Sequence, residues 1–285
     1  MSFPFVQFEF AFPLGPADGR YLRRVEAGGE AERVIVLRTV GAPQRRRFRR
    51  RRPRRVDRAE PAAVPTVRAT VIRPAEFVSD DDADGWLARM RRDGEQRELE
   101  VADAARALNF MLRAHRAAAA DPYVRDVVAE AATVVRVGYG SGEHVADGRF
   151  DAAYELPARP RRRPRRAELL QPQERLAATL SARQSLLPAE ELVLRARGDL
   201  EAHRPREAAL QARIALEALL AELADAPVGQ SAAIEARRPS VAAAANAALE
   251  GDPPGELSAA VEAAVAEMER TLRRVVLARA TPRSP

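Results

Sequence analysis

Apolar and polar residues alternate with a period of two at the start of the chain. From Val6 to Phe12, every second residue is valine or phenylalanine, and polar or small residues lie between them. This alternation predicts a strand with one buried face. Within residues 32–40, the run from Val34 to Leu37 is apolar on both faces as far as Arg38, which is typical of a strand inside a sheet. Together with Val6–Phe12, strands are predicted over residues 20–26, 32–40, 65–73 and 133–140.

A helical pattern replaces the alternation after residue 78. Ser79 is followed by three aspartates, and such a start provides a cap and places acids at the positive end of a helix. Gly94 divides the helical stretch. An apolar stripe with helical spacing then follows at Val101, Ala105, Leu108, Leu112 and His115. We therefore expect an α+β domain over residues 1–156, with an antiparallel or mixed sheet and one or two packed helices.

The second half of the chain has helical periodicity throughout. Pro188 and Pro205 fit helix starts, because proline is favoured in the first helical turn. The last helix is expected after Pro253-Pro254-Gly255, with an apolar stripe at Leu257, Val261, Val265, Met268, Leu272 and Val276. These patterns predict an all-α hairpin or bundle over residues 168–285.

The turn around Pro205 is similar to one tetratricopeptide repeat in the spacing of Ala196, Ala208, Ala212, Ala215 and Leu216. The likeness covers about one repeat length, and no second copy follows, whereas stable arrays need about three or more repeats. We therefore expect a helical hairpin here and transfer no function from the repeat family.

Positive charge is concentrated in two short segments. All 47 basic residues are arginine; nine of them lie at positions 45–55 and six at positions 159–166. The net charge is +6, so the rest of the chain carries −9. Blocks of like charge stay solvated. We therefore expect an Arg-rich loop at 44–58 and an Arg/Pro-rich linker at 157–167 between the two domains.

The two arginine runs are either solvated spacers or binding segments for an anionic partner, with nucleic acid as the leading candidate for that partner. Arginine binds phosphate through two parallel hydrogen bonds, and its planar group stacks on bases. Phe48 is the one aromatic residue within the runs, and no known nucleic-acid-binding motif accompanies them. The candidate binding residues are Arg45, Arg46, Arg47, Arg49, Arg50, Arg51, Arg52, Arg54, Arg55, Arg161, Arg162, Arg163, Arg165 and Arg166.

A glycine-rich loop, GYGSGEHVADGR at 138–149, is the second candidate site. Glycine-rich loops after strands often hold phosphate groups, and the side chains that a ligand would meet here are Tyr139, Ser141, His144 and Asp147. The spacing G-x-G-x-G differs from the dinucleotide-binding pattern, and the three residues of a usual catalytic triad come from distant elements. A flexible turn is the leading interpretation of this loop, and a ligand-binding or catalytic site is the alternative.

The acidic segment from Asp80 to Gly85 matches the first six positions of a calcium loop. Arg91 occupies the position of the bidentate glutamate, so we expect an acidic helix start and no metal site. A further alternative is that these acids hold one of the Arg runs. His115, on an apolar stripe, is expected to be structural.

Absent residue types exclude several functions. A chain without cysteine has no disulfide or thiolate nucleophile, and a chain without lysine has no Walker A loop or Schiff base. No apolar stretch reaches the length of a membrane span, and a cytoplasmic protein without cofactors is expected. The leading interpretation is a non-enzymatic adaptor whose C-terminal helices bind a protein partner. The alternatives are nucleic-acid binding through the arginine runs, and a small-ligand or enzymatic site at 138–149.

Overall fold

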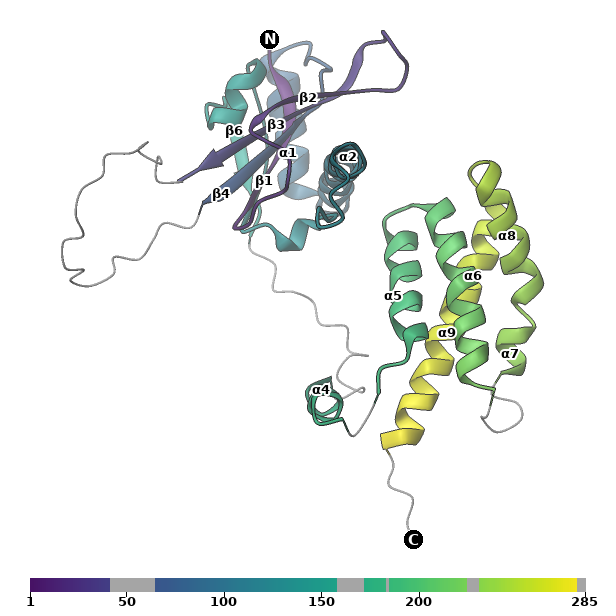
Figure 1. Cartoon of the computed structure of the whole chain (residues 1–285). Coiled ribbons are helices and arrows are strands. Elements are labelled where there is room, and N and C mark those ends of the chain that lie inside the picture. The colour runs from purple at the N-terminus through teal and green to yellow at the C-terminus, as the bar shows by residue number, and fades with distance from the viewer. Residues whose placement is uncertain (42–64, 158–171, 183–184, 225–230, 281–285) are drawn as a thin grey trace, which may run out of the picture. The chain divides into compact units, whose positions relative to one another are not determined.

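The computed structural model describes residues 1–41, 65–157, 172–182, 185–224 and 231–280 (Figure 1). The chain divides into two compact units, residues 1–162 and 163–285. We call them the α+β unit and the helical unit. The predicted Arg-rich loop and all of the predicted linker except Pro157 lie outside the described residues.

The α+β unit contains a six-stranded antiparallel sheet with the strand order β2-β3-β4-β1-β5-β6. Its strands are β1 (Phe3–Phe10), β2 (Gly19–Arg24), β3 (Ala31–Val40), β4 (Thr66–Ile72), β5 (Val134–Gly140) and β6 (Ala152–Glu155). The α+β prediction is confirmed, as are all five predicted strands. The short β6 was not predicted, because its four residues, AAYE, have too few apolar positions to show an alternation.

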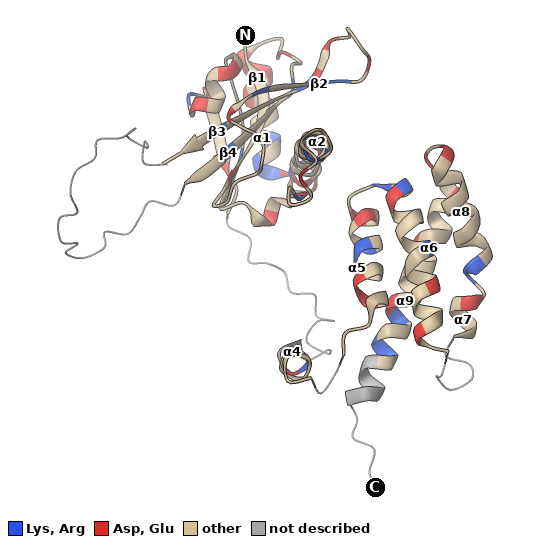
Figure 2. Ribbon diagram, viewed as in Figure 1, with Lys and Arg blue, Asp and Glu red and all other residues tan. Residues whose placement is uncertain are grey.

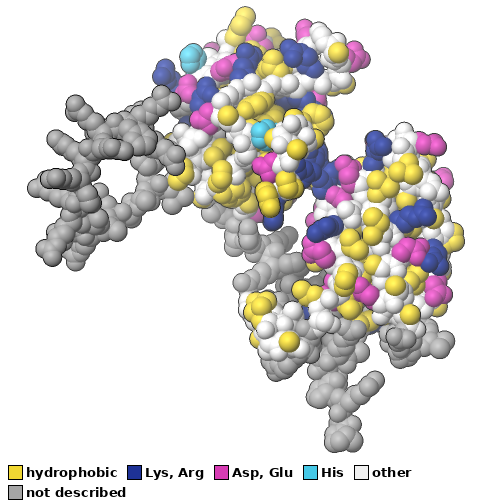
Figure 3. All heavy atoms as spheres, in the orientation of Figure 1, with side chains coloured by type: hydrophobic (Ala, Val, Ile, Leu, Met, Phe, Trp, Pro, Cys, Tyr) yellow, Lys and Arg dark blue, Asp and Glu magenta, His cyan; other side chains and the backbone are white. Residues whose placement is uncertain are grey.

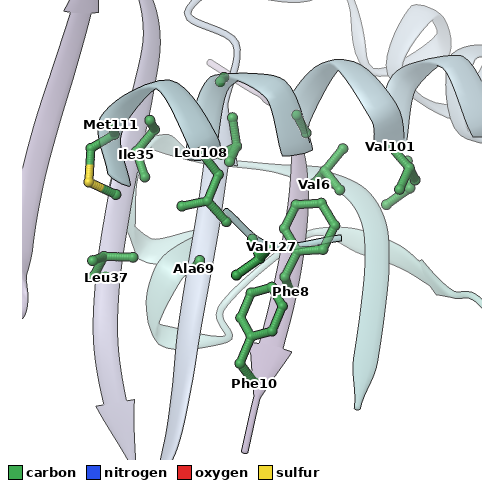
Figure 4. Close-up of a cluster of buried hydrophobic side chains, with 14 of the residues drawn as sticks. Val6, Phe8, Phe10, Ile35, Leu37, Ala69, Val101, Leu108, Met111 and Val127 are labelled. Carbon is green, nitrogen blue, oxygen red and sulfur yellow. The ribbon is translucent and has the colours of Figure 1, made fainter. Parts of the chain in front are cut away.

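Two helices cover one face of this sheet. Ser79 caps α1 (Asp80–Arg92) by accepting a hydrogen bond from the backbone N–H of Asp82, and Asp93 caps α2 (Gly94–Ala119) in the same way. The predicted division at Gly94 is thereby confirmed. Figure 4 shows α2 crossing the strands, with Val101, Leu108 and Met111 directed at the side chains of β1, β3 and β4. A 3₁₀ turn, η1 (Ala129–Ala131), precedes β5.

The connection between β5 and β6 covers part of the opposite face. Its 3₁₀ segment, η2 (Gly142–Asp147), folds back over the sheet. Val145 and Ala146 are buried there against Phe5, Val36 and Ile72. The sheet is therefore enclosed by helices on one side and partly by its own β5–β6 connection on the other.

The helical unit is an antiparallel bundle of α5, α6, α8 and α9. Short turns at 202–204 and 251–254 join α5 to α6 and α8 to α9, and α6 packs on α8 and α9. The helices are α4 (Pro172–Leu180), α5 (Pro188–Glu201), α6 (Pro205–Glu222), α7 (Ala232–Glu235), α8 (Arg238–Glu250) and α9 (Gly255–Ala280).

Alanine supplies much of the bundle core. Ala212 and Ala215 of α6, Ala244 of α8 and Ala264 of α9 are buried. The predicted helix starts at Pro188, at Pro205 and after Pro254 are confirmed. The sequence did not predict α4, α7 or α8. In α8, nearly half of the residues are alanine, and there is no stripe of large apolar residues.

Candidate functional site

Both arginine-rich segments adjoin the same end of the sheet. β3 ends at Val40 opposite Thr66, the first residue of β4, and β1 ends at Phe10 opposite Val67. β5 starts at this end as well, and β6, antiparallel to β5, runs toward it. The chain therefore enters segments 42–64 and 158–171 from one end of the sheet, which we call the basic end.

The attachment points lie close together. Three strand spacings separate β4 from β6 in the sheet, which is about 14 Å. Four spacings, about 19 Å, separate β3 from β6. A partner of modest size that binds at the basic end therefore lies close to the attachment points of both segments.

The described residues of both units carry a net negative charge, opposite in sign to that of the two arginine-rich segments. Segment 42–64 has ten arginines and two acids, and segment 158–171 has six arginines and one acid. The described residues of the α+β unit have 17 arginines and 22 acids, and those of the helical unit have 12 and 15. Figures 2 and 3 show acidic and basic side chains interspersed over both units. The fourteen candidate arginines themselves lie outside the described residues, so their role stays a prediction.

An ion network on the sheet stands beside the basic end. The Glu9 carboxylate on β1 accepts hydrogen bonds from Arg136 of β5 at 2.8 Å and Arg68 of β4 at 3.0 Å. Burial would raise the pKa of Glu9, but the hydrogen bonds and charges of the two arginines outweigh it and lower the pKa. Because Glu9 binds both arginines, this cluster holds three strands together. The polar residues that alternate with apolar ones along these strands were the sequence signal from which this cluster could have been predicted.

The 138–149 loop is tied to the sheet along its length. Gln7, fully buried on β1, donates to the carbonyl of Val145 at 3.1 Å and to Thr70 at 2.9 Å. Glu143 pairs with Arg20 at 2.6 Å. These contacts seat the loop against the face opposite the helices.

Close packing accounts for two glycines of this loop. A Cβ atom at Gly138 would lie 2.5 Å from the carbonyl oxygen of Ala152, and one at Gly140 would lie 2.7 Å from Cγ1 of Val145. Both distances are too short for a side chain. The glycine pattern resembles a phosphate-binding loop. At these two positions, however, close packing of the backbone explains why glycine is needed.

The four candidate side chains of this loop do not share one face of the sheet. Tyr139 points to the helix side, where its hydroxyl donates to Asp84 at 2.6 Å. That hydrogen bond, with burial, raises the pKa of Tyr139 to about 12. Ser141, His144 and Asp147 lie on the loop, and Asp147 is 3.6 Å from Arg38.

The acids at Asp80–Asp82 occupy the first turn of α1, as the helix-start interpretation predicted. Their helix contacts Tyr139 near the end of the sheet that is opposite the basic end.

His115 is half-buried beside Gly15. Within the described ranges, no group of three or more histidines and acids could hold a metal ion.

None of the described helices is long and apolar enough to cross a membrane. In comparisons with known proteins, the chain matches no family model, no curated protein and no solved structure.

Proposed function

We propose that this chain is a non-enzymatic binding protein whose partner is an anionic polymer, nucleic acid in the first place. The proposal rests on one observation: segments 42–64 and 158–171 both connect to the sheet at its basic end. Such a partner fits the cytoplasmic location that the sequence predicts.

The charge distribution directs such a partner to the basic end. Both described units have more acids than arginines and repel phosphate, whereas the two segments attract it. Duplex DNA carries one charge per about 1.7 Å of its axis, so a length equal to the span of about 14 Å between β4 and β6 carries about eight phosphates on its two strands. The two segments can therefore neutralise neighbouring phosphates of one ligand.

A salt titration tests this proposal. Each phosphate neutralised on a duplex contributes about −0.9 to the slope of log affinity against log salt, and with six such phosphates the affinity falls by roughly three orders of magnitude between about 50 and 200 mM. We expect Arg45, Arg46 and Arg47→Ser to reduce the slope. The matched control changes Arg270, Arg273 and Arg274 on α9 to serine and should leave the slope unchanged. Salt-independent binding, or no binding at about 50 mM salt, would contradict the proposal.

Exposed leucines favour a second candidate, a protein partner of the helical unit. Leu176 and Leu180 are one turn apart on α4 and are 52% and 79% exposed, and Leu186 is 63% exposed. Apolar side chains at this spacing are typical of a helix that packs on another protein. Binding of a specific partner should disappear with Leu176→Ser/Leu180→Ser and persist with the α9 arginine control. Retention by the leucine variant would exclude α4 as the contact.

A further inference from the structure

The loop after α2, residues 120–128, is anchored firmly against the α+β core. Val124 and Val127 are buried, and the side chain of Asn109 exchanges two hydrogen bonds of 2.8 Å with the backbone of Val127. Arg113 pairs with Asp126 at 3.4 Å. These contacts fix the backbone from Val124 to Val127.

The anchored loop presents an aromatic and a basic side chain to solvent. Tyr123 is 83% exposed, and Arg125 is also exposed. A second loop meets it: a Cβ atom at Gly15 would lie 2.7 Å from Cγ2 of Val124. On that second loop, Phe12 is 40% exposed, with its ring centre 5.3 Å from that of Phe10. Two exposed aromatic rings thus belong to neighbouring loops.

These loops lie at the basic end. Phe12 closely follows the end of β1, and Asp18 in the same connection hydrogen-bonds Thr39 near the end of β3. The anchored loop leads to β5, whose first residues are also at this end. The fold therefore brings aromatic side chains to the place where the arginine-rich sequences attach, although the sequence separates them.

We propose that Tyr123 and Phe12 form a stacking platform for the bases of single-stranded nucleic acid. The inference rests on the proposed function, because the arginine-rich segments would neutralise the phosphates of the same strand. Proteins that bind single strands combine a basic surface with aromatic rings, since every base has a face that can stack. In a duplex the bases already stack on one another, so the platform selects single strands over duplexes.

The anchoring contacts favour this use of Tyr123. A tyrosine ring on a fixed backbone loses little conformational freedom when a base stacks on it. Arg125, two residues further along the loop, adds a guanidinium that can pair with the adjoining phosphate.

The test compares two ligands of equal charge, a single strand of about 16 nucleotides and an abasic strand of the same length. Stacking of one base should contribute roughly five-fold or more to affinity. We expect Tyr123→Ala to weaken binding of the base-containing strand by that factor and to leave binding of the abasic strand unchanged. Tyr123→Phe keeps the ring and should bind as the unaltered chain does.

Phe110→Ala is the matched control. Phe110 is an aromatic residue that is 47% exposed on α2, where Arg23 lies over its ring. The substitution should leave the affinity for both strands unchanged. Because Tyr123 is exposed, its variants should keep the melting temperature of the unaltered chain.

The outcomes separate the two proposals. If Tyr123→Ala binds both strands as the unaltered chain does, and the binding remains salt-dependent, the stacking platform is wrong and the proposed function stands. Equal affinity for the base-containing and abasic strands, or for a duplex and a single strand, likewise overturns the platform. Absence of binding to every strand at about 50 mM salt overturns both.

Discussion

Gly140 allows the 138–149 loop to pack closely against the strand that it follows. At Gly140, the backbone of β5 approaches Val145 and Phe150 so closely that a Cβ atom would lie 2.7 Å from one and 3.0 Å from the other. Val145 is in turn fully buried against the sheet. The requirement for glycine at this position therefore comes from packing between the loop and the strand it follows.

We expect Gly140→Ala to lower the free energy of unfolding by about 1–3 kcal/mol, as overpacked positions do. Urea denaturation of the full chain measures this effect. Gly85→Ala is the control, because a Cβ atom there meets nothing within 4 Å and Gly85 lies inside α1. It should raise stability by roughly 0.5–1 kcal/mol. Equal effects of the two substitutions would contradict the packing argument.

Tyr139 gives the α+β unit a dependence on alkaline pH. Its hydrogen bond to Asp84 raises its pKa to about 12, above the ordinary value of 10.0 that holds in the unfolded chain. The folded state therefore keeps this proton more firmly, and the stabilisation is complete below pH 10 and disappears as the pH rises toward 12. The stability difference between the unaltered chain and Tyr139→Phe should shrink over that range. A difference that stays constant would show that the hydrogen bond does not control the titration.

At the scale of elements, Glu9 links three neighbouring strands. Its carboxylate binds Arg68 of β4 and Arg136 of β5. Because the folded-state pKa of Glu9 is lowered, the stabilisation is complete above the unfolded value of about 4.5 and disappears as the pH falls through the folded value.

We expect Glu9→Gln to lower the free energy of unfolding at pH 7 by about 1–3 kcal/mol, the usual range for hydrogen bonds to charged groups. The loss should become smaller as the pH falls below about 4. Glu155→Gln is the control: Glu155 also pairs with Arg136, but its side chain is 57% exposed, so a change below about 1 kcal/mol is expected. Chemical denaturation at several pH values distinguishes the two, and a pH-independent loss for Glu9→Gln would contradict the role of its charge.

Elements with strong local signals were predictable from the sequence. The valine and phenylalanine alternation indicated β1, and Ser79 and Gly94 marked the starts of α1 and α2. The folding of η2 over the sheet was not predictable, because it depends on contacts between Val145 and strands far away in the sequence. The loop sequence showed glycines and polar residues but not which face they would cover.

At the scale of the whole molecule, each unit has its own core. Phe8 and Leu108 belong to one buried cluster, and Leu216 and Met268 to another. We therefore expect fragments 1–157 and 172–285 to fold separately, each with a cooperative thermal transition followed by circular dichroism. An unfolded fragment would show that the two cores depend on each other.

The candidate site was predictable only in part. The two arginine runs are obvious in the sequence, but their shared attachment follows from the order and direction of six strands. Phe12 and Tyr123 are 111 positions apart, and the close approach of Gly15 to Val124 brings their loops together. A site assembled by topology has no local sequence pattern.

Joint binding of one nucleic-acid strand by the two arginine-rich segments is tested most directly by a double-variant cycle on the full chain. The arginines at 45–55, those at 161–166, and both sets together are changed to serine, and the salt dependence of binding to one short single strand is measured each time. If both segments bind the same strand, each single variant lowers the slope of log affinity against log salt, by about 0.7 for each phosphate that is no longer neutralised, and the double variant removes most of the slope. A slope that either set alone leaves unchanged would contradict joint binding at the basic end.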